Sequence, residues 1–223
     1  METTFVAPKV LEQTYAEVQQ RFSSIADLAH GWEHVNRVYA LALSIAEEEG
    51  ADSFVVGMAA LLHDLGRAAP ASDTGHHADI SVTLARELLK KYNVPADLQE
   101  AIIHAILAHS FSKGLQPHTL EARIVRDADR LDALGAIGIL RWAITGVVKH
   151  TPHSYHPNDP FAEQHDLEDS SYMLDHFYSK LLKLGDTMST KTGRFLAERR
   201  TAFMRTYLYE LKRELVAIPA AEK

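Results

Sequence analysis

The segment Ser53-Phe-Val-Val-Gly-Met-Ala-Ala-Leu-Leu-His-Asp-Leu-Gly66 decides the fold. It is almost entirely apolar, Ser53 suits an N-cap and Gly66 suits a helix end, so it predicts a helix over 53–65. His63 and Asp64 are the unusual residues in it. An ionised carboxylate among apolar neighbours costs on the order of several kcal/mol in desolvation, so Asp64 is expected to be paired or to bind a metal. Exposure at the helix end, just before Gly66, is the alternative.

Helical periodicity continues on both sides of this segment. Between Glu33 and Gly50 the apolar residues recur at the spacing of one helix face. Further helices are predicted over 78–92, 96–110, 120–134, 136–149, 169–183 and 191–216, with a loop rich in helix breakers over 151–168. No stretch alternates strictly between apolar and polar residues, so strands are not expected. This pattern predicts an all-α fold in a single domain.

Composition and charge exclude several classes of protein. The chain has 223 residues, a net charge of -7, 13 histidines and no cysteine. An acidic chain without a dense basic run is not expected to bind nucleic acid through many phosphates. The absence of cysteine excludes disulfides and thiolate sites, so a tight metal site must use imidazole and carboxylate. Neither a secretory signal nor an apolar run of about 18 residues is visible, which predicts a cytoplasmic protein without a membrane partner.

Two further residues are candidate metal ligands. His34 shares the apolar stripe of its helix with Val38 and Leu41, although a hydrogen-bonded core histidine is the more common situation. Asp129 lies on the predicted helix 120–134. Its alternative role is an exposed ion pair with Arg126 or Arg130, worth less than about 1 kcal/mol. Taken singly, none of these residues is decisive.

The order of these residues is more informative than each of them alone. His34, then His63 with Asp64, then Asp129, each on a separate predicted helix, resembles the ligand pattern of the HD metal-dependent phosphohydrolases. Adjacent residues on a helix point about 100° apart, so His63 and Asp64 can grip an ion only by bracketing it.

The flanking segments are similar to the small standalone bacterial HD hydrolases over roughly residues 25–216. These segments are His30-Gly-Trp-Glu-His-Val-Asn-Arg-Val38, residues 60–67, His104-Ala-Ile-Leu-Ala-His-Ser110, residues 121–138, Asp159-Pro-Phe161, residues 175–184, Met188-Ser-Thr190 and Ala197-Glu-Arg199. One departure is Gly31, because relatives usually carry an acidic residue there. If that acid orients His34, its role here passes to Glu33 or to water.

The resemblance implies a helical bundle with a central metal cleft and a specific set of ligands. The metal-binding core is expected over about 25–150, and the helices over about 169–216 are expected to complete one domain spanning 1–223. The implied ligands are His34, His63, Asp64 and Asp129, which hold one divalent ion per chain. Manganese is the expected ion, and Mg, Fe, Co, Ni and Zn are the alternatives.

The implied reaction is hydrolysis of a nucleotide or a related phosphate ester. Characterised relatives include a pyrophosphohydrolase that converts nucleoside triphosphates to monophosphate and pyrophosphate. An ion that holds a phosphate oxygen and activates a water would promote in-line attack on phosphorus, with Asp64 as the catalytic residue that steers or deprotonates that water. The side chains expected to bind substrate are Arg37, Arg67, His104, His109, Arg130, Lys180 and Lys183.

A second metal ion is the less favoured expectation. Two-metal members add histidines between the His-Asp pair and the final aspartate, where His77, His104 and His109 lie. His104 and His109 point about 140° apart on a helix, so they can hardly both face one ion. Metal stoichiometry also separates the main alternative functions, a di-iron oxygenase of the wider superfamily and a non-catalytic nucleotide-sensing module. Base selectivity and oligomeric state are not encoded in these motifs.

Overall fold

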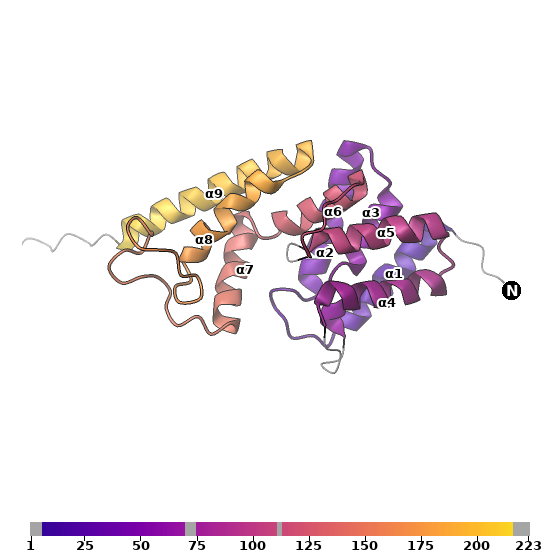
Figure 1. The fold of residues 1–223 in the computed structure, drawn as a ribbon, viewed down its shortest axis with the longest axis horizontal. Coiled ribbons are helices and arrows are strands. Elements are labelled where there is room, and N and C mark those ends of the chain that lie inside the picture. The colour runs from indigo at the N-terminus through magenta and orange to yellow at the C-terminus, as the bar shows by residue number, and fades with distance from the viewer. Residues whose placement is uncertain (1–5, 70–74, 111–112, 216–223) are drawn as a thin grey trace, which may run out of the picture. The chain divides into compact units, whose positions relative to one another are not determined.

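The computed structural model describes residues 6–69, 75–110 and 113–215, and the regular secondary structure of these residues consists of helices joined by loops (Figure 1). The α-helices are α1 (Ala7–Phe22), α2 (Trp32–Glu49), α3 (Ser53–Leu62), α4 (His77–Lys91), α5 (Ala96–His109), α6 (Leu120–Leu131), α7 (Gly135–Val148), α8 (Asp175–Ser179) and α9 (Lys191–Leu215). Short 3-10 helices cover Leu65–Ala68 (η1) and Leu181–Thr187 (η3). In the described residues β-type pairing is confined to an isolated bridge between His153 and Tyr172. The predicted all-α class is confirmed.

Helix α3 lies at the centre of its bundle. It packs against α1, α2, α4 and α5, and every residue from Val55 to Leu62 is buried. The carboxylate of Asp52 accepts hydrogen bonds from the N–H groups of Phe54 and Val55, so Asp52 is the N-cap and the prediction of Ser53 was wrong by one residue. The α-helix also ends earlier than predicted. His63 is its C-cap, and the chain continues through Asp64 into η1.

Two other segments differ from the expected helices. α1 was not predicted, because its buried residues Val10, Thr14, Val18 and Phe22 supply only one inward side chain per turn. The predicted helix over 169–183 is instead the five-residue α8 followed by η3. None of the helices in the described residues is long and apolar enough to span a membrane alone, although the bent pair Leu120–Leu131 and Gly135–Val148 passes by length and composition.

The chain forms two compact units. The first contains Met1–Arg130 and Ser189–Gly193, and the second contains Leu131–Met188 and Arg194–Lys223. The predicted metal-binding core over 25–150 extends across the boundary at 130/131, and the single-domain organisation stays a prediction.

Within the second unit, the long segment before α8 is organised around His165. Its Nδ1 lies 2.9 Å from Asp159 Oδ2, and its Nε2 lies 3.0 Å from Oδ2 of the fully buried Asp175. The ring of His156 stacks on His165 with centroids 4.4 Å apart. One imidazole therefore bridges two carboxylates that are distant in sequence.

Asp127 on α6 ties the segment Ser189–Gly193 to the first unit. This fully buried carboxylate accepts hydrogen bonds from Ser189 N–H at 2.9 and 3.0 Å, from Thr190 N–H at 2.8 Å and from the Thr190 hydroxyl at 2.8 Å. A Cβ at Gly193 would lie 2.5 Å from Asp127 Oδ2, so glycine is needed for the close approach. We call these interactions the Asp127 clasp.

Candidate metal centre

His63 is presented as a potential ligand by the end of α3. Its Nδ1 lies 2.7 Å from the carbonyl oxygen of Ala60, and because a carbonyl only accepts, Nδ1 carries the hydrogen. The lone pair is therefore on Nε2. Burial lowers the pKa of His63 to about 4, against the opposing charge of Asp64, so the ring is neutral at pH 7. A neutral imidazole with a defined tautomer is the form that binds metals.

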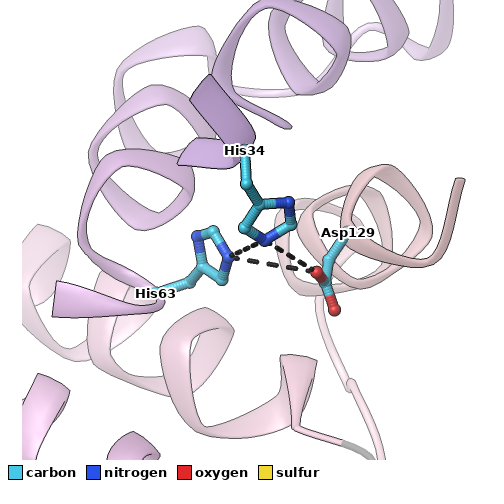
Figure 2. A group of neighbouring side chains, drawn as sticks. All are labelled: His34, His63 and Asp129. Atoms are coloured by element: carbon cyan, nitrogen blue, oxygen red, sulfur yellow. Dashed lines mark hydrogen bonds and ion pairs between the residues drawn. The ribbon is translucent and has the colours of Figure 1, made fainter. Parts of the chain in front are cut away.

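Three side chains from separate helices converge at this nitrogen (Figure 2). His34 of α2 approaches with its Nε2 3.3 Å from His63 Nε2. Asp129 of α6 places Oδ1 3.4 Å from His34 Nε2 and 4.0 Å from His63 Nε2. Both histidines are buried, while the Asp129 side chain is 27% exposed and gives the group its contact with solvent. We call His34, His63 and Asp129 the first ligand group.

Asp64 lies between this group and a second one. Its Oδ2 is 3.8 Å from His34 Nε2 and accepts a 2.7 Å hydrogen bond from Arg67 Nε. Its Oδ1 is buried and has no hydrogen-bond partner in the described part of the chain. Burial raises the pKa of Asp64, but its closeness to His63 and to the Arg67 guanidinium outweighs this effect and holds that pKa below its usual range. A buried ionised oxygen without a donor is an unusual feature that a bound cation would explain.

The second ligand group is formed by Asp64, His77 and His109. His77 Nε2 and His109 Nε2 lie 3.7 and 3.8 Å from Asp64 Oδ1. His109 resembles His63 in its tautomer, because its Nδ1 lies 2.5 Å from the carbonyl oxygen of Ile106. Burial lowers the pKa of His77 to about 4, so this ring is also neutral at pH 7.

The residues present fit a divalent cation. Ligand atoms around one ion at about 2.1 Å lie about 3.0–3.4 Å apart when they occupy adjacent positions. The distances from His34 Nε2 to His63 Nε2 and to Asp129 Oδ1 are 3.3 and 3.4 Å. His34 Nε2 and His63 Nε2 lie within hydrogen-bond distance of each other, so either a hydrogen on His34 Nε2 or a cation between the two nitrogens avoids repulsion of their lone pairs. Imidazole with carboxylate suits Mn, Fe, Co, Ni or Zn.

Of the residues predicted to bind substrate, some contact the ligand groups and others do not. Arg67 contacts Asp64, and His109 joins the second ligand group. Arg37 and Arg130 are half-buried, close in sequence to His34 and Asp129. His104 is not brought to either group, since its Nε2 accepts the N–H of His118 and the two rings stack. Lys180 and Lys183 belong to the second unit. The substrate-binding role of all these residues stays a prediction.

Two features of the site were not anticipated. His77 was weighed only as an additional histidine, because its approach to Asp64 depends on how α4 packs on η1, which sequence spacing does not reveal. Gly31 has a steric reason, since a Cβ there would lie 2.5 Å from the carbonyl oxygen of Asp27. The Asp27 carboxylate lies 3.2 Å from His30 Nδ1. A carboxylate is thus present beside this segment, although at position 27 instead of 31.

Comparison with known proteins gives a consistent set of relatives. The HD-domain family profile matches residues 31–134. The Bacillus subtilis protein YpgQ is 37% identical over 196 residues, which are 86% of this chain and 87% of YpgQ. The crystal structure of Bacillus subtilis YpgQ in complex with ADP is similar at a TM-score of 0.72 with 32% identity, covering 95% of this chain and 98% of that one. An HD-superfamily hydrolase from Bacillus thuringiensis gives a TM-score of 0.75 with 31% identity, covering 96% and 100%.

Proposed function

The chain belongs to the HD-domain family of metal-dependent phosphohydrolases, and on that premise we propose that it hydrolyses nucleoside triphosphates to monophosphate and pyrophosphate. The observation that carries the proposal is the convergence of His34 Nε2, His63 Nε2 and Asp129 Oδ1, with Asp64 Oδ2 3.8 Å from His34 Nε2. The first ligand group together with Asp64 forms the proposed four-ligand metal site.

Each residue has a defined task in this proposal. A divalent ion, manganese by preference, would supply positive charge for a phosphate oxygen and acidity for a water molecule. His34, His63 and Asp129 bind and orient through a nitrogen or oxygen atom. Asp64 is held ionised, so its carboxylate can accept a hydrogen bond from the attacking water and orient it. Arg67, fixed on Asp64, is a cation for the phosphate chain.

The bond changes are simple. Water attacks the α-phosphorus in line, the bond from that phosphorus to the bridging oxygen of the β-phosphate breaks, and pyrophosphate leaves with the electron pair. The attacking water loses its proton to solvent or to a phosphate oxygen. A nucleotide as substrate class is supported by the ADP bound to the similar protein YpgQ.

A second candidate function follows from the second ligand group. Asp64 lies between the two groups with one oxygen toward each, an arrangement that can bind two ions. Occupation of both sites by iron would favour the di-iron oxygenase alternative. A chain that binds metal but hydrolyses nothing would favour the nucleotide-sensing alternative.

Metal content and product analysis on one sample test the proposal. We expect at least one divalent ion per chain and Mn²⁺-dependent release of pyrophosphate from a panel of nucleoside triphosphates. His63→Ala and Asp64→Ala should lose bound metal and hydrolysis while retaining helical content by circular dichroism. His118→Ala is the matched control, because this exposed histidine lies outside both ligand groups. Full hydrolysis by metal-free Asp64→Ala protein would refute the mechanism.

A further inference from the structure

Ser81 on α4 is a buried residue whose hydroxyl holds the segment that follows Asp64. Its side chain is fully buried, and its Oγ accepts the backbone N–H of Gly66 at 2.8 Å. Gly66 is the second residue of η1, and the N–H groups at the start of a helix have no acceptor within that helix. The hydroxyl of Ser81 therefore supplies, from α4, a hydrogen-bond acceptor that η1 itself lacks.

The backbones of η1 and α4 touch where this hydrogen bond forms. A Cβ at Gly66 would lie 2.3 Å from the carbonyl oxygen of His77 and 2.9 Å from the backbone nitrogen of Ser81. His77 and Ser81 are four residues apart, so they lie on the same face of α4. The hydrogen bond from Gly66 to Ser81 thus fixes η1 against the first turn of α4, the turn that begins with His77.

Asp64 is attached to the same part of η1. It is the N-cap of η1, its carbonyl oxygen accepts the N–H of Arg67 at 2.9 Å, and its Oδ2 accepts Arg67 Nε at 2.7 Å. Both hydrogen bonds join the two ends of the segment 64–67, which contains Gly66. A displacement of Gly66 from α4 would therefore move the Asp64 carboxylate as well.

His77 meets Asp64 across the contact that Ser81 holds. The Nε2 atom of His77 lies 3.7 Å from Asp64 Oδ1 in the second ligand group. The other carboxylate oxygen, Oδ2, lies 3.8 Å from His34 Nε2 in the first ligand group. The position of η1 on α4 consequently sets how Asp64 is presented to both groups.

We propose that Ser81 is a positioning residue of the metal centre, which holds the turn that carries Asp64 against α4 by accepting the Gly66 N–H. This inference rests on the proposed function, in which Asp64 binds the ion and orients the attacking water. Ser81 belongs to neither ligand group, so it acts through Asp64 and not on the ion. Groups that orient a metal ligand contribute to metal affinity even though they do not contact the metal.

The test measures Mn²⁺ binding by calorimetry in the full chain and in its Ser81 variants. Ser81→Ala removes the acceptor, and we expect its Mn²⁺ affinity to fall by about 10- to 100-fold, the usual loss when a group that orients a metal ligand is removed. Ser81→Thr keeps an acceptor oxygen and should recover most of that affinity. Its additional methyl group should still lower the melting temperature, because position 81 is fully buried.

Ala85→Gly is the matched control for a loss of stability in the same helix. Ala85 is fully buried one turn beyond Ser81 on α4, and glycine there destabilises the helix without removing a hydrogen-bonding side chain. This variant should have a lower melting temperature and an unchanged Mn²⁺ affinity. Positioning is thereby separated from general stabilisation of α4.

The kinetics of triphosphate hydrolysis give a second measurement. At saturating Mn²⁺, Ser81→Ala should have a lower kcat and an unchanged KM, because a displaced Asp64 orients the attacking water poorly without affecting how the nucleotide binds. A rise in KM with an unchanged kcat would contradict the inference, since it would place Ser81 in substrate binding.

Two further results would overturn the inference. Unchanged Mn²⁺ affinity in Ser81→Ala would show that the contact with Gly66 does not position Asp64. Equal losses of Mn²⁺ affinity in Ser81→Ala and Ala85→Gly would show that only the stability of α4 matters. The proposed function fails separately, because a chain whose Mn²⁺ affinity depends on Ser81 but that releases no pyrophosphate keeps the positioning role and refutes the reaction.

Discussion

Substitution of Asp127 by alanine should destabilise the protein without changing its metal ligands. The carboxylate accepts from three donor groups, Ser189 N–H, Thr190 N–H and the Thr190 hydroxyl. Bonds to a charged acceptor contribute about 1.5–3 kcal/mol each, which would give about 4.5–9 kcal/mol for three. Burial raises the pKa of Asp127 although these bonds lower it, so the desolvation of the carboxylate offsets a large share of that sum.

We therefore expect a loss of about 2–4 kcal/mol for Asp127→Ala, most of it from donors left without an acceptor. For a chain of this length, each kcal/mol shifts Tm by about 2–4 °C, so Tm should fall by about 5–15 °C. Asp127→Asn should lose less stability than Asp127→Ala, because the amide carbonyl oxygen still accepts a hydrogen bond. The amide NH₂ group cannot accept one and faces the remaining donors, so some stability is still lost. Glu87→Ala, which removes an exposed carboxylate of α4, should stay within about 0.5 kcal/mol.

Thermal and urea unfolding, followed by circular dichroism, measure these changes. A decrease in Tm of less than about 2 °C for Asp127→Ala would refute the reasoning, because the buried Asp127 clasp would then contribute no more to stability than a surface carboxylate. An equal loss of stability in Asp127→Asn and Asp127→Ala would show that the acceptor oxygen retained by asparagine contributes nothing to stability.

Three further outcomes follow from other contacts. Hydrogen bonds to the carboxylates of Asp159 and Asp175 raise the pKa of His165, so the protonated ring stabilises the fold. This stabilisation is complete below the ordinary histidine pKa and is lost as pH rises through the raised value. Unfolding measured over a series of rising pH should show the loss, and His165→Gln should make stability less dependent on pH over that range. Gly66→Ala should cost about 2–4 kcal/mol, because the new Cβ would lie 2.3 Å from the carbonyl oxygen of His77, and an unshifted urea midpoint would contradict this. Burial raises the pKa of Glu17, but hydrogen bonds from Lys91, Tyr92 and Arg21 outweigh this effect and lower the pKa from 4.5 to about 2. The free energy of unfolding should therefore fall by about 1 kcal/mol as pH falls from 4.5 through 2. Glu17→Gln should remove that acid dependence.

The helices that carry the metal centre were the predictable part of the fold. α2, α3, α5 and α6 have dense apolar periodicity, and their bounds agree with the predicted ranges to within a few residues. Helix α1 was missed because its buried residues are too sparsely spaced to form a clear apolar pattern. The helix predicted around α8 was too long, because side-chain contacts and not apolar periodicity organise that segment. The spacing of apolar residues therefore predicts a helix only where one face of that helix is buried along its whole length.

The ligand set was predictable in identity but not in geometry. The resemblance pointed to His34, His63, Asp64 and Asp129, and the structure brings these side chains together. Their assignment as ligands stays a prediction until metal is measured. The position of Asp64 between two groups was not predictable, because it depends on the chain leaving α3 at His63 and turning into η1. Packing of α4 then brings His77 to the second oxygen of Asp64.

The Asp127 clasp has a consequence for how the protein is made. The backbone passes between the units at 130/131, 188/189 and 193/194, so the first unit is not encoded by one contiguous stretch. During synthesis, α6 and its Asp129 emerge well before the donors of Ser189 and Thr190. N-terminal regions generally fold first on the ribosome, but here the buried Asp127 lacks its hydrogen-bond donors until Ser189 and Thr190 have been translated. Completion of the unit that bears the metal centre is therefore a late step, and a nascent chain stalled before residue 189 should expose Asp127 to solvent.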